Sequence, residues 1–179
     1  MSFPTRLFLS PARHPSVAKP WPPAAAEARR VRLGDPATLV ITDFTRELPA
    51  TVTEDRSIDD ALEDMVFAGV HALLVVRGDL ASGLITSYDI QGDGPLILLT
   101  APSYRRPDQI AVGEIMTPWD QVPKLDWSLV NAARVFELAR AFRRMRATHL
   151  VVVQNLEYRG AFVRALISRR RLNRQLGLD

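Results

Sequence analysis

This chain of 179 residues contains the same succession of local sequence patterns twice. Each copy begins with a short apolar stretch and a polar turn, followed by a segment with helical spacing. Two strand-like segments and a second helix-like segment come next. The copies align on three pairs of polar residues, which are Ser57 with Ser128, His71 with His149, and Thr86 with Ser168. The repeated β-α-β-β-α unit predicts an α/β fold of two half-domains related by a pseudo-twofold axis.

In the first copy, Ser57 followed by Asp60 resembles a capping box, and apolar residues then recur at helical spacing until Gly69. The continuous apolar run that follows is typical of a buried strand. The elements expected here are strands at Ala50–Val52, Val70–Val76 and Ala81–Thr86, a helix from Ile58 to Ala68 and a short helix from Ser87.

The second copy is longer between its serine and its histidine, with 21 residues against 14 in the first copy. Seven residues make about two helical turns, so the difference predicts a longer helix rather than an extra loop. The elements expected here are strands at Val122–Pro123, Thr148–Val153 and Phe162–Ser168, a long helix at Leu129–Arg146 and a closing helix at Arg169–Gln175.

Residues 1–44 precede the repeats and read as a proline-rich arm, because seven of the 13 prolines lie within residues 1–36. We expect the arm to be extended, with one helical turn at Ala24–Arg30 and a strand at Thr38–Thr42. The sequence therefore predicts an arm at 1–44, a first repeat with a linker at 45–111 and a second repeat at 112–179.

The composition excludes several classes of protein. The chain has no cysteine, which removes disulfide scaffolds, zinc ribbons and thiol catalysis, and its three histidines are too scattered for an all-histidine metal site. We therefore expect no metal. No apolar run is long enough to span a membrane, and the N-terminus does not read as a signal peptide, so we expect a cytoplasmic protein without membrane association.

Charge is divided unevenly along the chain. Residues 1–133 carry 12 basic and 17 acidic side chains, whereas residues 134–179 carry 11 basic and three acidic ones. Among the 23 basic residues only Lys19 and Lys124 are lysine. The arginine-rich C-terminal part suits a phosphorylated ligand, nucleic acid or an acidic partner, and a genome that favours arginine is the alternative explanation.

Three features resemble one known family. They are the segment Gly-Leu-Ile-Thr-Ser-Tyr-Asp at 83–89, the segment Val-Gly-Glu-Ile-Met-Thr-Pro at 112–118, and the order helix, Gly-Val-His, apolar strand around His71. Over about residues 45–178 the chain resembles a tandem pair of CBS domains, also called a Bateman module. The resemblance implies two CBS repeats that share a cleft.

The resemblance also implies that an adenosine nucleotide, AMP, ADP or ATP, binds in that cleft. The Thr86 hydroxyl and nearby N–H groups would donate to a phosphate, and the Asp89 carboxylate would accept from the ribose diol. The alternative is that Asp89 only caps its own helix. The residues expected around the nucleotide are Thr86, Ser87, Asp89, Ala50, Thr51, Val70, His71, Ala72, Leu73, Ser168, Arg169 and Arg171.

The second repeat departs from the family pattern, because Arg171 stands where the first repeat has Asp89. A guanidinium has no acceptor and cannot receive the protons of a diol, so we expect one nucleotide per chain. Arg169, Arg170 and Arg171 would reach the phosphates of that nucleotide or another anion, and a solvated helix face is the alternative. His71 and His149 are expected to be packed or bonded to backbone rather than to act as ligands.

We expect a non-catalytic regulatory module that senses energy state through adenosine nucleotides and signals by conformational change to a separate effector protein. Its homodimer would form through the helices, as the resemblance implies. No phosphate-binding loop or nucleophile motif supports an enzyme. A scaffold that binds nucleic acid or a protein partner through the arginine-rich C-terminal part, with no nucleotide, is the alternative function.

Overall fold

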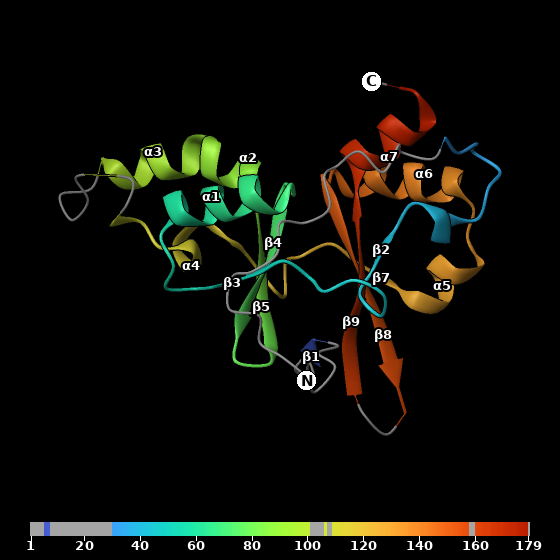
Figure 1. Cartoon of the computed structure of the whole chain (residues 1–179), viewed down its shortest axis with the longest axis horizontal. Coiled ribbons are helices and arrows are strands. Elements are labelled where there is room, and N and C mark those ends of the chain that lie inside the picture. The colour runs from blue at the N-terminus through green and yellow to red at the C-terminus, as the bar shows by residue number, and fades with distance from the viewer. Residues whose placement is uncertain (1–5, 8–29, 101–105, 107–108, 158–159, 179) are drawn as a thin grey trace. The chain divides into compact units, whose positions relative to one another are not determined.

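The computed structural model describes residues 6–7, 30–100, 106, 109–157 and 160–178. The described residues fall into two compact units, which Figure 1 shows with their elements. The first unit contains residues 49–122, and the second unit contains residues 6–7, 30–48 and 123–178. Each unit has its own sheet, its own helices and its own hydrophobic core.

The first unit follows the predicted order of strands and helices. β4 is its central strand and pairs parallel with β3 and antiparallel with β5, which in turn pairs antiparallel with β6. The elements are β3 (Thr51–Thr53), α1 (Ile58–Ala68), β4 (Ala72–Arg77), β5 (Leu80–Thr86), α2 (Ser87–Gln91), α3 (Asp93–Leu99), α4 (Val112–Ile115) and β6 (Thr117–Pro118).

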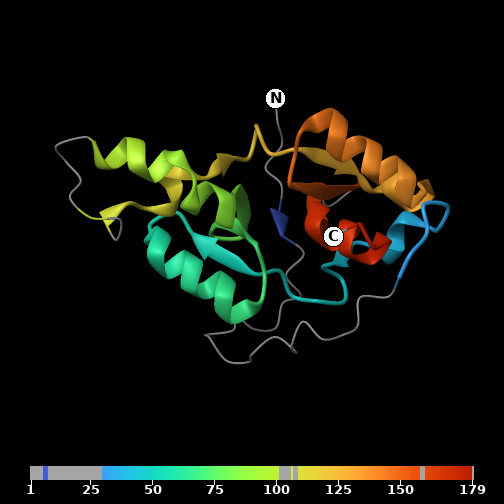
Figure 2. The ribbon, with the colours of Figure 1, turned by 90° about the horizontal axis from the view of Figure 1, so that it is seen from above.

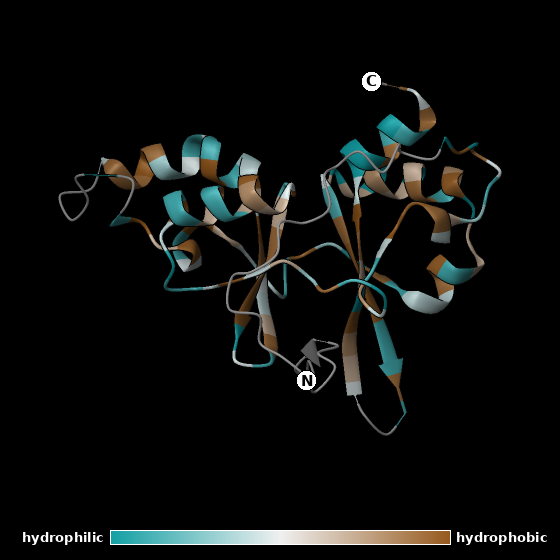
Figure 3. Ribbon diagram, in the orientation of Figure 1, coloured by the Kyte–Doolittle hydropathy of each residue, from teal (hydrophilic) through white to brown (hydrophobic). Residues whose placement is uncertain are grey.

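Local signals read from the sequence set the ends of α1. The Ser57 hydroxyl accepts a hydrogen bond from the Asp60 N–H at 3.1 Å, and Gly69 ends the helix in the left-handed region at φ +64°. The buried face of α1 contributes Ile58 and Met65 to a core that also holds apolar residues of β4 and β5. Figure 3 shows the hydrophobic stretches of these two strands.

The second unit repeats this arrangement. β8 pairs parallel with β7 and antiparallel with β9, and β9 also pairs with β1 and β2. The elements are β1 (Arg6–Leu7), η1 (Ala37–Leu39), β2 (Thr42–Asp43), β7 (Lys124–Asp126), α5 (Trp127–Ala132), α6 (Val135–Met145), β8 (His149–Leu156), β9 (Gly160–Ser168) and α7 (Arg169–Leu176). The mixed α/β fold of two repeats is therefore confirmed.

The long helix predicted at Leu129–Arg146 is wrong, because the chain forms two helices, α5 and α6. Between them Ala133 and Arg134 are extended. Residues 35–37 hold them there, since the Ala37 N–H donates to the Ala133 carbonyl and the Val135 N–H donates to the Asp35 carbonyl. α6 has 11 residues, as α1 does, so the residue that matches Ser57 is Arg134 and not Ser128.

The predicted alignment of the two histidines is also wrong, by one residue. Thr86 pairs with Ala72, whereas Ser168 pairs with His149. The Ser87 N–H donates to the His71 carbonyl, and the equivalent N–H of Arg169 donates to the Thr148 carbonyl. His71 therefore matches Thr148, and the two histidines occupy different positions in their units.

Each unit is completed by a segment that precedes the other repeat. Residues 112–118 form α4 and β6, and β6 pairs with β5 of the first unit. Residues 37–43 form η1 and β2, and β2 pairs with β9 of the second unit. The bonds that join these segments to α1 and α6 also correspond, since the Ile58 N–H donates to Ile110 as the Val135 N–H donates to Asp35.

The N-terminal segment therefore differs from the prediction. Residues 30–48 belong to the second unit rather than to an arm, and of the strand expected at Thr38–Thr42 only Thr42 is in a strand. The strand needs β9 as its partner, which local sequence patterns do not show. The predicted helical turn at Ala24–Arg30 and most of the arm lie outside the described residues.

Gly83 has a packing role on β5. A Cβ atom there would lie 2.7 Å from Met116 Sδ and 2.7 Å from the Thr117 carbonyl oxygen. The glycine therefore lets β6 approach β5 closely, which explains why the motif at 83–89 begins with this residue type.

Candidate functional site

The residues predicted around a nucleotide gather at one end of the sheet of the first unit. β3 and β4 are parallel and begin at this end, and the antiparallel strand β5 finishes there. Ala50 lies before β3, Val70 and His71 lie before β4, and Ser87 follows β5. The fold thus brings together the nine residues of the first repeat that were predicted: Ala50, Thr51, Val70, His71, Ala72, Leu73, Thr86, Ser87 and Asp89.

Thr86 and Asp89 bind each other in a capping box at the start of α2. Asp89 Oδ2 accepts hydrogen bonds from the Thr86 N–H and from the Thr86 hydroxyl, both at 2.8 Å. The Thr86 hydroxyl oxygen accepts from the Asp89 N–H at 3.3 Å. The capping role considered for Asp89 is therefore present in the structure.

The capping box limits what these two side chains can offer a ligand. The single hydroxyl proton of Thr86 is donated to Asp89, so donation to a phosphate requires this hydrogen bond to break. Asp89 is half-buried, and its Oδ1 atom lies outside the box. That oxygen is an acceptor available to a hydroxyl group.

The neighbouring residues differ in how they can contact a ligand. Leu73 points its side chain into the core and is 2% exposed, and Ala72 is buried as well. Thr51 and His71 are exposed, while Ser87 is half-buried. Exposed or half-buried polar side chains at this end of the sheet therefore come from Thr51, His71, Ser87 and Asp89, and Thr86 adds a buried hydroxyl.

The equivalent end of the second unit has a cation in place of the carboxylate. The Ser168 hydroxyl caps α7 by accepting from the Arg171 N–H at 3.4 Å. The Arg171 side chain turns to β2, where its Nη1 donates to Thr42 Oγ1 at 2.8 Å. Arg169 and Arg170 are exposed. Arg171 is thus bound to a strand of its own unit.

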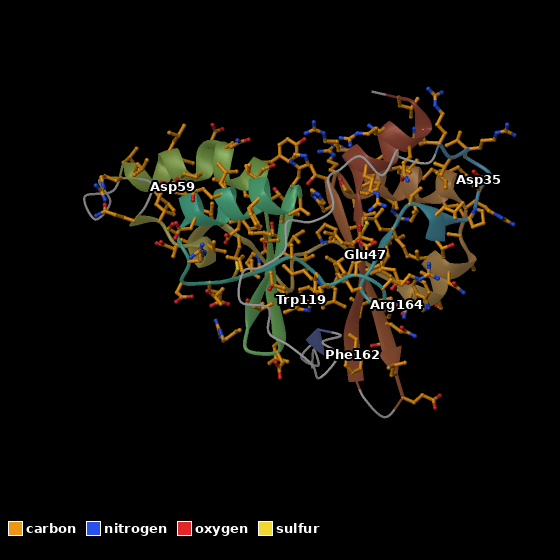
Figure 4. The ribbon with its side chains drawn as sticks, viewed as in Figure 1. Asp35, Glu47, Asp59, Trp119, Phe162 and Arg164 are labelled. Atoms are coloured by element: carbon orange, nitrogen blue, oxygen red, sulfur yellow. The ribbon has the colours of Figure 1, made fainter. Side chains whose placement is uncertain are left out.

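Sequence reasoning missed a charged cluster in the second unit. Arg164, labelled in Figure 4, lies on β9 with its guanidinium 4.4 Å from the centre of the Trp127 ring. Its Nη2 donates to Asp43 Oδ2 at 3.0 Å, and both side chains are less than one-fifth exposed. The signal in the sequence is that Arg164 is the one charge within the apolar strand 162–168.

The surroundings of Asp43 change its acidity. Burial raises the pKa of this carboxyl, but hydrogen bonds from the Thr45 hydroxyl and N–H and the charge of Arg164 outweigh that effect. The pKa of Asp43 is therefore lowered. In the first unit the pKa of Glu54 is also lowered, chiefly because its carboxylate accepts a hydrogen bond from Arg77 at 2.6 Å.

Comparison with known proteins identifies the family. The family model of the CBS domain matches residues 41–92, which contain β2 to α2. The chain is a CBS-domain protein. Because the second unit repeats the sheet and helices of the first, its architecture is that of a tandem CBS protein.

Solved structures of CBS proteins share this architecture. A protein with CBS domains from Burkholderia ambifaria MC40-6 is 27% identical and superposes with a TM-score of 0.54, over 73% of this chain and 84% of that chain. CBSX2 from Arabidopsis thaliana in complex with AMP is 23% identical, with a TM-score of 0.51, over 79% of this chain and 95% of that one.

The CBS domain of a bacterial CNNM/CorC family Mg²⁺ transporter in complex with ATP is 15% identical. It superposes with a TM-score of 0.55, over 82% of this chain and 90% of that chain. The sequence matches no curated protein. Within the described residues of this CBS protein, no group of histidine or acidic side chains is arranged to hold a metal ion, and no helix could cross a membrane.

Proposed function

We propose that this CBS protein is a non-catalytic regulatory module that binds one adenosine nucleotide per chain, AMP, ADP or ATP. The nucleotide would bind at the end of the first sheet where Thr86 and Asp89 lie. Two proteins of the same fold support the proposal, because CBSX2 binds AMP and the transporter's CBS domain binds ATP. A separate effector protein would receive the signal.

The observation that carries the proposal is the position of the Asp89 carboxylate. Its Oδ2 atom holds the start of α2, and its Oδ1 atom is left to accept from a ribose hydroxyl. Hydrogen bonds to a charged acceptor contribute about 1.5–3 kcal/mol each, which is enough to select a nucleoside with an intact diol.

Binding of a nucleotide would also change the protein locally. If the Thr86 hydroxyl donates to a phosphate, it must release Asp89 Oδ2, which leaves the Thr86 N–H as the remaining donor in that half of the capping box. A ligand transmits a signal only when it binds one conformation more tightly than another. The altered start of α2 is the conformational difference that we propose.

The stoichiometry of one follows from the second unit. Arg171 offers donors where Asp89 offers acceptors, and its guanidinium is bound to Thr42. The diol of a second nucleotide would find no carboxylate at this position.

Isothermal titration calorimetry with AMP, ADP and ATP tests the proposal on the wild type and on Asp89→Asn. An asparagine keeps one oxygen for the capping box and replaces the other by an NH₂ donor, so binding should weaken about tenfold or more while the helix start is retained. Asp93→Asn is the matched control, because Asp93 lies exposed in the first turn of α3. Binding that is equal in all three proteins, or absent for every nucleotide, contradicts the proposal.

A further inference from the structure

The helices of the second unit are rich in arginine, although the fold does not require this. α6 and α7, which lie side by side in Figures 1 and 2, contain seven basic side chains and one acidic one. Their equivalents in the first unit, α1 and α2, contain five acidic side chains and no basic one. A genome that favours arginine explains the choice of arginine over lysine, but it does not explain this contrast between two copies of one fold.

The arginines of the two helices gather where α6 ends and α7 begins. The chain leaves α6 through Arg146, and the Arg169 N–H at the start of α7 donates to the Thr148 carbonyl at 2.9 Å. The first turn of α7 therefore lies beside the residues that follow the last turn of α6. We call the exposed arginines of this region the arginine surface, which consists of Arg140, Arg143, Arg144, Arg146, Arg169, Arg170 and Arg174.

The charge of this surface is not neutralised within its own unit. The one carboxylate of the two helices, Glu137, accepts a hydrogen bond from the Arg134 N–H at 2.8 Å and so caps the start of α6. Among the residues that the structure describes, no ion pair involves Arg140, Arg143, Arg144, Arg146, Arg169 or Arg170. The positive charge is therefore available to an external anion.

Stability explains the arginines of α6 but not those that begin α7. Cations are favourable at a helix C-terminus, where Arg143 and Arg144 lie in the last turn of α6. A helix N-terminus carries partial positive charge, so Arg169 and Arg170 are unfavourable in the first turn of α7, which has no acidic residue. These arginines and the helix start add their positive potentials, and an external anion would offset the cost.

The composition of the exposed face of α7 indicates which kind of polyanion it fits. Leu172 is buried in the core, and the four exposed side chains are all arginine. Protein interfaces have an apolar centre that is depleted in charge, and a helix at a membrane surface immerses an apolar face. Interfaces with nucleic acid are instead polar and strongly positive. The exposed face of α7 therefore fits nucleic acid better than a protein or a membrane.

We propose that the arginine surface binds the phosphate backbone of a nucleic acid duplex, DNA or RNA, without reading its sequence. On α6, Arg140 and Arg144 are four residues apart, which is about 6 Å along the helix axis. Arg170 and Arg174 have the same spacing on α7. Successive phosphates of one strand are about 3.4 Å apart along the duplex axis, so each arginine of such a pair can bind a separate phosphate.

A duplex fits this surface better than a single strand, because α7 contains no aromatic side chain on which unpaired bases could stack. The duplex would be a second ligand, bound by the second unit independently of the adenosine nucleotide proposed for the first unit.

Fluorescence anisotropy of labelled DNA and RNA duplexes measures this binding to the full chain in the absence of adenosine nucleotides. We expect a micromolar dissociation constant at about 50 mM KCl, with equal affinity for two DNA duplexes of unrelated sequence. Counterion release lowers the association constant as salt is added, and contacts from five arginines predict a log–log slope of about −4.5 for DNA. Binding to either duplex supports the proposal, and the tighter one identifies the nucleic acid.

Single variants test whether the arginine surface makes the contact. Arg144→Gln and Arg170→Gln each remove one cation, so each should weaken binding several-fold for every duplex sequence and make the slope shallower by about 1. The double variant should lose about 2 from the slope. Arg46→Gln is the matched control, because Arg46 is exposed and lies outside both helices, and it should leave the slope unchanged.

Three outcomes would overturn the proposal. One is no binding of either duplex at about 100 µM protein and 50 mM KCl, conditions under which even non-specific contacts are detectable. Another is a wild-type slope in both Arg144→Gln and Arg170→Gln, although circular dichroism shows that they are folded. The third is tighter binding to polyglutamate or to vesicles of anionic lipid than to either duplex, which would assign the arginine surface to an acidic protein or a membrane.

Discussion

Asp43 joins the segment 30–48 to the sheet of the second unit, so replacing it tests whether this segment is part of the folded unit. Asp43 Oδ1 accepts from the Thr45 N–H at 2.9 Å and from the Thr45 hydroxyl at 2.7 Å. Its other oxygen, Oδ2, accepts from Arg164 at 3.0 Å. In Asp43→Ala all three hydrogen bonds are lost, and the charge of Arg164 is left without its partner.

The magnitude follows from the burial of the pair. Removing one partner of a buried ion pair costs about 3–5 kcal/mol, because the remaining charge is desolvated and uncompensated. Arg164 and Asp43 are 19% and 16% exposed, which allows some hydration of the remaining guanidinium. The Nε atom of Arg164 is buried and has no hydrogen-bond partner among the described residues, so the guanidinium has little other compensation. We expect a loss of about 3 kcal/mol in the free energy of unfolding.

Urea denaturation followed by tryptophan fluorescence measures this loss, since Trp127 stacks on Arg164 and reports on the second unit. Asp120→Ala, at an exposed position, is the control and should change the free energy by less than about 0.5 kcal/mol. The double variant Asp43→Ala/Arg164→Met should lose less than the two single variants together, because no unpaired charge remains. A loss below about 1 kcal/mol in Asp43→Ala would refute the reasoning.

Two further predictions concern the helix ends and pH. Arg146 ends α6 at φ +51°, where Gly69 ends α1 at φ +64°, so Arg146→Gly should stabilise and Gly69→Ala destabilise the protein by about 1 kcal/mol each in urea denaturation. The pKa values of Asp43 and Glu54 are lowered by folding from ordinary values of 3.8 and 4.5. The contribution of these two carboxylates to the free energy of unfolding is complete above their ordinary pKa values and is lost as the pH falls through their pKa values in the folded state. The urea midpoint should therefore fall on acidification below about pH 4.5. A midpoint that rises between pH 5 and pH 3 would contradict this sign.

Local patterns were sufficient for much of the first repeat. The cap at Ser57, the glycine at 69 and the apolar run of β4 are short-range signals, and the structure has the corresponding elements. The same is true of the contact between Thr86 and Asp89, because residues three apart at a helix start are neighbours in any fold. The sequence also showed that the second repeat lacks this carboxylate.

Only the tertiary structure decided the features that depend on distant partners. Arg164 and Asp43 are 121 residues apart, and nothing near either residue indicates that they form an ion pair. The break between α5 and α6 depends on residues 35–37, and the register of His149 depends on its pairing with Ser168. The hydrogen bonds of a helix cap are made between residues within one helical turn. A strand or a buried charge instead finds its partner on a segment that can be distant in the sequence and that the fold brings close. The amino-acid order therefore determined the order of elements in the repeats and the caps at Ser57 and Thr86, and packing determined which segment completes each repeat.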